Sequence, residues 1–245
     1  MLHAINQKKS SHYKRYLGHR DSNDGRVCEE DEITSTIIGP MDFMSSDEIH
    51  RFWSALFQLK SRPDVFGELS VQPPNSIEVK LWPSRQVNYG RERVEPDATI
   101  EFIWPDNTRI LLLIEFKWRA NLSGEDQLHR QWNHYLTEEE QAYTFHLFIA
   151  PVVTEGISAR NSELGDIWGH RLILITWETF RRALNTIKNN DKATTTLGRW
   201  STVADSFLQK IGIKKFVGFG NLVDELNFNI PSSTPLFWTH TSSRQ

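Results

Sequence analysis

The pattern of hydrophobic and polar positions near the start of the chain predicts two helices. The acidic residues 29–32 favour the first turn of a helix, and Gly39-Pro40 is a stop signal for it. Ser45 and Glu48 then have the spacing of a capping box. The helix that they begin carries an apolar stripe at positions i, i+3, i+4 and i+7, made of Ile49, Phe52, Trp53 and Leu56. This stripe predicts a helix that packs on the core.

The middle of the chain changes to strand patterning. Residues 77–82 alternate moderately and residues 94–104 alternate well. The second segment places Ala98, Ile100 and Phe102 on one face and Asp97, Thr99 and Glu101 on the other. Pro105-Asp106-Asn107 predicts a turn, so residues 109–118 are expected to return antiparallel. Because residues 110–114 are apolar on both faces, this strand should be central and covered on both sides.

The second half of the chain alternates between helix and strand patterns. Gln127, Gln131 and Tyr135 recur every four residues, which places them on one face of a predicted helix. Residues 145–153 predict a buried strand and residues 171–176 a shorter one, with helices at about 177–187 and 202–211. With no internal repeat and no long linker, the pattern predicts one α/β domain with a mixed central sheet flanked by helices.

Composition narrows the class of protein. A chain of 245 residues that is 38% hydrophobic, with nine tryptophans and fourteen phenylalanines, can bury a substantial core. We find no apolar run near the ~18 residues of a membrane span, and residues 1–20 lack the apolar centre of a signal peptide, so a cytoplasmic location is expected. The single cysteine, Cys28, excludes an intramolecular disulfide and a Cys-rich zinc site.

Charge is distributed unevenly along the chain. The net charge of −3 argues against a generally basic nucleic-acid binder, although residues 1–20 contain no acid. They hold five basic residues around Tyr13 and Tyr16, a mixture that suits either phosphate contacts or a solvated tail. A second basic zone, residues 181–215, favours an exposed helix face with a minority of phosphate contacts. We therefore expect a basic polar tail at residues 1–26, followed by a single domain at 27–245 with an irregular C-terminal extension.

Three charged residues fall where the buried strands should end. Glu115 and Lys117 are two residues apart, so they project from one face, and a neighbouring strand would bring Asp97 to that face. Two carboxylates this close repel each other, and a divalent cation such as Mg²⁺ relieves the repulsion. The backbone carbonyl of Phe116 offers a further oxygen ligand. Lys117 would then hold the attacking water or stabilise charge on a phosphoryl group.

These residues resemble the signature of the PD-(D/E)xK nuclease superfamily. That signature is Pro-Asp, a spacer, and then Asp or Glu, any residue and Lys on the next strand; Pro96-Asp97 and Glu115-Phe116-Lys117 match it. The resemblance implies a restriction-endonuclease-like core and covers roughly residues 29–180. It also implies a supporting metal ligand on the first helix, for which Glu30 is the best match and Asp31 the second.

Lambda-exonuclease-like branches of the superfamily place a glutamine on the helix after the lysine strand. Gln127 and Gln131 both match that position, and the resemblance implies that one of them orients the water or a phosphate. It implies no other cofactor than Mg²⁺ or Mn²⁺.

The resemblance implies a metal-dependent nuclease, expected to be a DNA endonuclease in antiviral defence, restriction or repair. RNA remains an alternative substrate, and a homodimer or a targeting partner protein is left open. A different class of function is an inactive nuclease-fold subunit that binds nucleic acid or a partner protein. A non-nuclease hydrolase is disfavoured because no nucleophile elbow or histidine-based motif is present.

Overall fold

The computed structural model describes residues 30–86, 93–118, 122, 126–191 and 194–213, except for the side chains of residues 30, 70, 86, 165, 166 and 210. These residues belong to one compact unit, Met1–Lys214, and the second unit, Lys215–Gln245, lies outside them. The expected basic tail, residues 1–26, and the irregular C-terminal extension therefore also lie outside the described residues.

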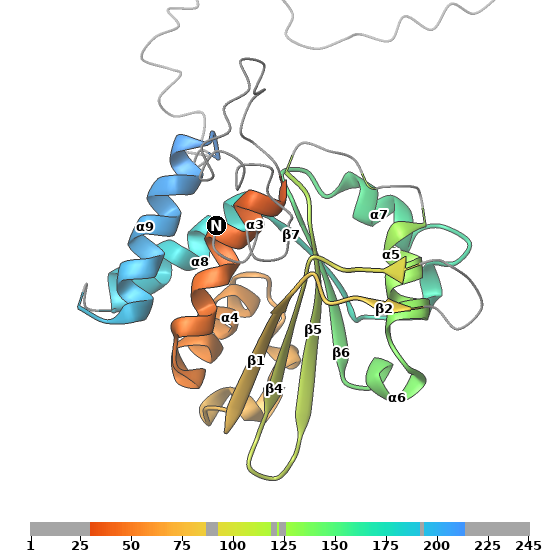
Figure 1. The fold of residues 1–245 in the computed structure, drawn as a ribbon, viewed down its shortest axis with the longest axis horizontal. Coiled ribbons are helices and arrows are strands. Elements are labelled where there is room, and N and C mark those ends of the chain that lie inside the picture. The colour runs from red at the N-terminus through yellow and green to blue at the C-terminus, as the bar shows by residue number, and fades with distance from the viewer. Residues whose placement is uncertain (1–29, 87–92, 119–121, 123–125, 192–193, 214–245) are drawn as a thin grey trace, which may run out of the picture. The chain divides into compact units, whose positions relative to one another are not determined.

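A five-stranded mixed sheet organises the described unit (Figure 1). Its order is β1-β4-β5-β6-β7. The β1, β4 and β5 strands pair antiparallel, whereas β5, β6 and β7 pair in parallel. The strands are β1 (Ser76–Leu81), β4 (Ala98–Ile103), β5 (Arg109–Phe116), β6 (Thr144–Ala150) and β7 (Leu172–Thr176). The mixed sheet, the antiparallel return and the central, doubly covered β5 are confirmed.

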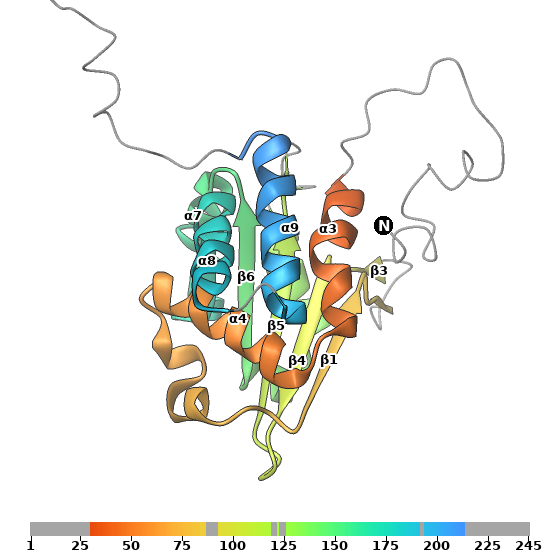
Figure 2. The same cartoon turned by 90° about the vertical axis from the view of Figure 1, so that its left-hand side faces the viewer.

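Helices cover both faces of this sheet (Figures 1 and 2). One face carries the four longer helices, α3 (Glu30–Ile38), α4 (Ser46–Leu59), α8 (Trp177–Asn190) and α9 (Thr196–Lys210). The opposite face carries α5 (Gln127–Arg130), the π-helix η4 (Gln131–Tyr135) and α7 (Thr154–Arg160). The shorter elements are η1 (Gly39–Phe43), η2 (Pro63–Val65), η3 (Gly67–Val71), β2 (Arg85–Gln86), β3 (Arg93–Val94), α6 (Glu138–Gln141) and η5 (Gly165–Trp168).

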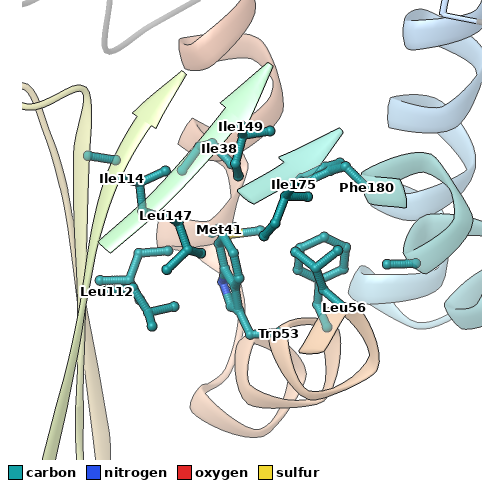
Figure 3. Close-up of a cluster of buried hydrophobic side chains, with 14 of the residues drawn as sticks. Ile38, Met41, Trp53, Leu56, Leu112, Ile114, Leu147, Ile149, Ile175 and Phe180 are labelled. Atoms are coloured by element: carbon teal, nitrogen blue, oxygen red, sulfur yellow. The ribbon is translucent and has the colours of Figure 1, made fainter. Parts of the chain in front are cut away.

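Two apolar cores follow from the alternation of side chains along β5. Leu112 and Ile114 belong to the larger core, where Trp53 and Phe180 pack against the sheet (Figure 3). Leu111 and Leu113 point the other way, into the smaller core under α5, η4 and α7. Because side chains alternate along a strand, Glu115 and Lys117 continue the row of Leu111 and Leu113. The charged end of β5 therefore lies on the face that carries the shorter helices.

Several boundaries differ from the sequence prediction. Residues 94–104 do not form one strand, because Pro96 has no N–H to donate to a ladder. Instead β3 pairs with β2 in a separate two-stranded sheet, and β4 begins only after Asp97. The last helix begins at Thr196 rather than near residue 202, since the Thr195 side chain caps it by accepting from Gly198 N–H at 3.0 Å. The capping box of Ser45 and Glu48 is confirmed.

A buried ion pair joins α8 and α9 and gives a test of how these two helices pack together. Arg181 Nε of α8 lies 2.7 Å from Asp205 Oδ1 of α9, and both side chains are about nine-tenths buried. Removing one partner leaves an uncompensated buried charge. Asp205→Ala should therefore lower the free energy of unfolding by about 3–5 kcal/mol, measured by denaturant titration. The exposed pair of Glu78 and Lys80 is the control, and Glu78→Ala should cost under about 1 kcal/mol. Equal losses of unfolding free energy in the two variants would contradict the prediction that the buried pair contributes more to stability than the exposed one.

Candidate active site

Asp97 lies against the end of β5. It directly precedes β4, and its Oδ2 accepts a hydrogen bond of 2.7 Å from the backbone N–H of Phe116. This bond holds the aspartate beside the residue that separates Glu115 from Lys117. The carbonyl of Phe116 projects to the same edge of the strand as its N–H, because both groups of one residue do so in a β-strand. The Asp97 carboxylate and the Phe116 carbonyl are thus brought to one place.

Glu115 is almost completely buried, with 1% of its surface exposed, and three donors surround its carboxylate. The side-chain amides of Gln127 and Gln131 donate to Oε1 at 2.7 Å and to Oε2 at 2.6 Å. The Lys117 ammonium lies 2.8 Å from Oε1. A buried carboxylate is stable only when it is hydrogen-bonded or paired with a cation, and here it has both.

The helix that supplies both glutamines changes its winding at the site. α5 is a single α-helical turn that passes into the π-helix η4 at Gln131. Gln127 and Gln131 both reach Glu115, and the Tyr135 side chain hydrogen-bonds Thr99 of β4. The predicted shared face is confirmed. π-Helical turns are frequent at functional sites.

The backbone of Lys117 is anchored on both sides. Its N–H donates to the carbonyl of Ile149 at 2.8 Å, and its carbonyl accepts from Trp177 Nε1 at 2.7 Å. The indole of Trp177 also stacks on Phe116, with ring centroids 5.5 Å apart. The position of the lysine is therefore fixed from β6 and from the start of α8.

Two residues that sequence reasoning missed lie behind Gln131. His146 of β6 has its Nε2 3.1 Å from Gln131 Oε1, and Trp168 of η5 donates its indole N–H to His146 Nδ1 at 3.1 Å. The histidine is completely buried, and burial lowers its pKa from 6.5 to about 3. The only available signal was one histidine in an otherwise apolar strand pattern.

The Glu115–Lys117 pair differs in burial from a second pair with the same spacing in the sequence. Glu78-Val79-Lys80 on β1 is also Glu-x-Lys, and its Nζ–Oε2 distance is likewise 2.8 Å. The side chains of that pair are 53% and 54% exposed, whereas those of Glu115 and Lys117 are 2% and 7% exposed. A charged pair that faces water in this way is an ordinary surface ion pair, so the Glu78–Lys80 pair is an internal reference for the buried one.

A pocket of ≈ 170 Å³ opens beside the two glutamines. It is lined by Arg93, Val94, Glu95, Gln127, Arg130 and Gln131. Gln127 and Gln131 therefore contact Glu115 and also form part of the pocket wall. Two arginines and two amides make this wall rich in hydrogen-bond donors.

The donor set at the end of β5 suits a hard divalent cation. Asp97, Glu115 and the Phe116 carbonyl offer oxygen ligands, and Mg²⁺ takes one or two carboxylates and keeps several waters. Within the described ranges, no cluster of three or more His, Cys, Asp or Glu residues is placed to hold a metal ion. Glu30, the predicted supporting ligand, is the first residue of α3, and its side chain lies outside what the structure describes. The catalytic and metal-binding roles assigned from the sequence stay predictions.

Comparisons with known proteins add little to this geometry. No family model matches the chain. No curated protein matches it. Among solved structures, the chain is similar to the MspJI restriction endonuclease in complex with a 27-mer oligonucleotide, with 14% sequence identity and a TM-score of 0.30. The match covers 85% of this chain and 42% of that one, so the chain spans about two fifths of that protein.

The helices that the structure describes include none that is both long and apolar enough to cross a membrane.

The buried histidine predicts how stability depends on pH. The folded state keeps His146 neutral down to about pH 3, whereas the unfolded chain protonates it near pH 6.5, so the unfolded state binds more protons between these values. The free energy of unfolding should therefore fall as the pH decreases from about 6.5, and His146 should contribute about 1.4 kcal/mol per pH unit near pH 5.

Denaturant titrations between about pH 7 and 4.5 test this prediction. His146→Gln should reduce the slope of the free energy of unfolding against pH by about one proton. His50→Gln is the comparison variant: burial also lowers the pKa of His50, which lies on α4, so this variant should reduce the slope as well. A slope unchanged by His146→Gln would mean that His146 titrates normally in the folded protein.

Proposed function

We propose that this chain is a metal-dependent nuclease that hydrolyses phosphodiester bonds, with DNA as the substrate. The observation that supports the proposal most is the buried group of Asp97, Glu115 and Lys117 at the end of β5. Burying three charges at one point is costly unless they serve chemistry that needs them there. Their order and their placement at two adjoining strands match the PD-(D/E)xK signature.

The metal ligands in this proposal are Asp97, Glu115 and the Phe116 carbonyl, with Glu30 as a further candidate. A divalent cation held there, Mg²⁺ or Mn²⁺, supplies Lewis-acid stabilisation of charge on the phosphoryl oxygens. Gln127 and Gln131 hold the Glu115 carboxylate in place through the hydrogen bonds described above. Asp97 is oriented by the Phe116 N–H.

Lys117 provides a positive charge beside Glu115. In hydrolysis the oxygen of a water bonds to phosphorus while one ester P–O bond breaks. The attacking water gives up one proton and the leaving oxygen takes one up. The ammonium, fixed 2.8 Å from Glu115, is placed to hold that water or to stabilise the negative charge that grows on the phosphoryl group.

The pocket beside the glutamines is the proposed place for the substrate backbone. Arg93 and Arg130 line it, and arginine is the residue best suited to bind phosphate with paired N–H groups. A phosphodiester in this pocket would be a neighbour of the one that reacts at Glu115 and Lys117, because Gln127 and Gln131 line the pocket and also contact Glu115. Endonuclease action, a defence or repair role, and a dimer or targeting partner are further parts of the proposal.

Cleavage of circular and linear DNA in Mg²⁺, Mn²⁺ or EDTA tests the nuclease proposal. Lys117→Ala should reduce the cleavage rate by about 10²- to 10³-fold, because it removes a preorganised charge at the reacting phosphate. Lys80→Ala, in the exposed Glu-x-Lys pair, should leave the rate unchanged. Nicking of circles would identify an endonuclease. Intact DNA binding without cleavage in any metal would instead favour the inactive nuclease-fold subunit.

The pocket generates a separate prediction about substrate binding. Arg130→Ala should raise the KM for DNA roughly tenfold or more with a smaller change in kcat, since it removes a charge-assisted hydrogen bond made in the ground state. The slope of the logarithm of the DNA-binding constant against the logarithm of the salt concentration should also decrease by about 1, as expected for the loss of one phosphate contact. Arg109→Ala, at the opposite end of β5, is the charge-matched control. Equal effects of the two substitutions on KM and salt slope would rule out a phosphate site in the pocket.

A further inference from the structure

The hydrogen bonds behind Glu115 form a chain with one direction. An indole N–H can only donate, so Trp168 Nε1 makes His146 Nδ1 an acceptor. A neutral imidazole then carries its proton on Nε2 and donates it to the amide oxygen of Gln131 at 3.1 Å. The amide nitrogen of Gln131 is thereby turned toward Glu115, to which it donates at 2.6 Å. Each group donates to the next, from the indole to the carboxylate.

This series of hydrogen bonds determines which way the side-chain amide of Gln131 is oriented. A glutamine amide has an oxygen and a nitrogen of nearly equal size, and its two orientations differ only in which atom faces the carboxylate. The wrong orientation would place the amide oxygen against Glu115 and repel it. A histidine with its proton on Nδ1 would accept at Nε2 and favour that wrong orientation. The indole N–H removes this tautomer, because it needs an acceptor at Nδ1.

These hydrogen-bonded side chains are buried in an apolar core. His146 is completely buried and Gln131 is 2% exposed. The imidazole is stacked on Trp132, with centroids 6.2 Å apart and an interplanar angle of 13°. Trp168 belongs to the same apolar core. In such surroundings a missing donor or acceptor is not replaced by water, so each link depends on the one before it.

We propose that Trp168 and His146 are positioning residues of the candidate active site, which act through Gln131 to hold Glu115 in the position that binds the divalent cation. The indole sets the tautomer of the histidine, the histidine sets the orientation of the glutamine amide, and the amide fixes the carboxylate. The link to cation binding rests on the proposed nuclease function. The link from Trp168 to Glu115 stands on the hydrogen bonds alone.

Trp168→Phe tests this series of hydrogen bonds without substituting any residue that contacts Glu115. It removes the indole N–H, keeps most of the ring, and should leave His146 as a mixture of tautomers. The matched control is Trp132→Phe, a change of equal size at an equally buried position of the same core. It removes no link in the chain. Thermal unfolding of both variants measures the packing loss that they share.

Three readouts separate the two variants. The ¹⁵N shifts of His146 should show the Nε2–H tautomer in the wild type and in Trp132→Phe but a mixture in Trp168→Phe. The ¹³C shift of the Glu115 carboxyl should move only in Trp168→Phe. The affinity for Mn²⁺, measured by calorimetry without DNA, should fall about 10- to 100-fold in Trp168→Phe, as is typical when a group that orients a metal ligand is lost. Equal tautomers, carboxyl shifts and affinities in the two variants would overturn the proposal.

A second pair of variants covers the case in which Trp168→Phe does not fold. His146→Gln supplies an amide N–H near the position of Nε2, whereas His146→Leu supplies none. His146→Gln should keep the Glu115 carboxyl shift closer to that of the wild type, and equal shifts in the two would contradict the chain. If the wild type binds no Mn²⁺, the proposed function fails, and the tautomer and the carboxyl shift still decide the positioning role.

Discussion

The carboxylate of Glu115 imposes the constraint around which the site is built. It lies at the end of the apolar β5 strand with 1% of its surface exposed. A carboxylate in such a position is costly unless hydrogen bonds and a nearby positive charge replace the water that it has lost. Both glutamines of the α5–η4 segment and Lys117 provide these. The helix must therefore pack over the end of β5, and its change to π-helical winding occurs where the second glutamine meets the carboxylate.

The two faces of the sheet differ in the side chains that they bury. The face under α3, α4, α8 and α9 is apolar, and its large aromatic core holds the strands in register. The other face has a smaller apolar core in which the polar chain of Trp168, His146 and Gln131 is embedded. Trp177 links the large core to the charged end of β5. Its ring packs on Phe116, and its indole N–H donates a hydrogen bond to the carbonyl of Lys117. The rigid core thus fixes the backbone of the residues that carry the charges.

Much of this arrangement could be predicted from the sequence because it depends on local periodicity. Alternation along a strand places Glu115 and Lys117 on one side, and helical spacing places Gln127 and Gln131 together. The apolar run before Glu115 distinguishes that pair from Glu78 and Lys80, whose strand has an exposed face. These features are properties of short segments, which single-sequence patterns describe well.

The remaining features depend on contacts between distant segments, which no short pattern contains. His146 lies between Phe145 and Leu147, so its strand reads as apolar, and its role appears only when Gln131 packs above it. Trp168 comes from a short turn of 3₁₀-helix that has no periodic signal of its own. The strand break before β4 was missed although Pro96 was visible, because the alternation of residues 94–104 continues across it. Tertiary packing decided each of these cases.

We propose that Asp97 and Glu115 together form a divalent cation site at the end of β5. An anomalous difference map from crystals of the protein soaked in Mn²⁺ tests it most directly. We expect one peak in contact with a carboxylate oxygen of Asp97, a carboxylate oxygen of Glu115 and the Phe116 carbonyl, at the short distances that oxygen ligands take to such ions. A map at saturating Mn²⁺ with no peak there, and with Glu115 still bonded to Lys117 and both glutamines, would rule out this cation site.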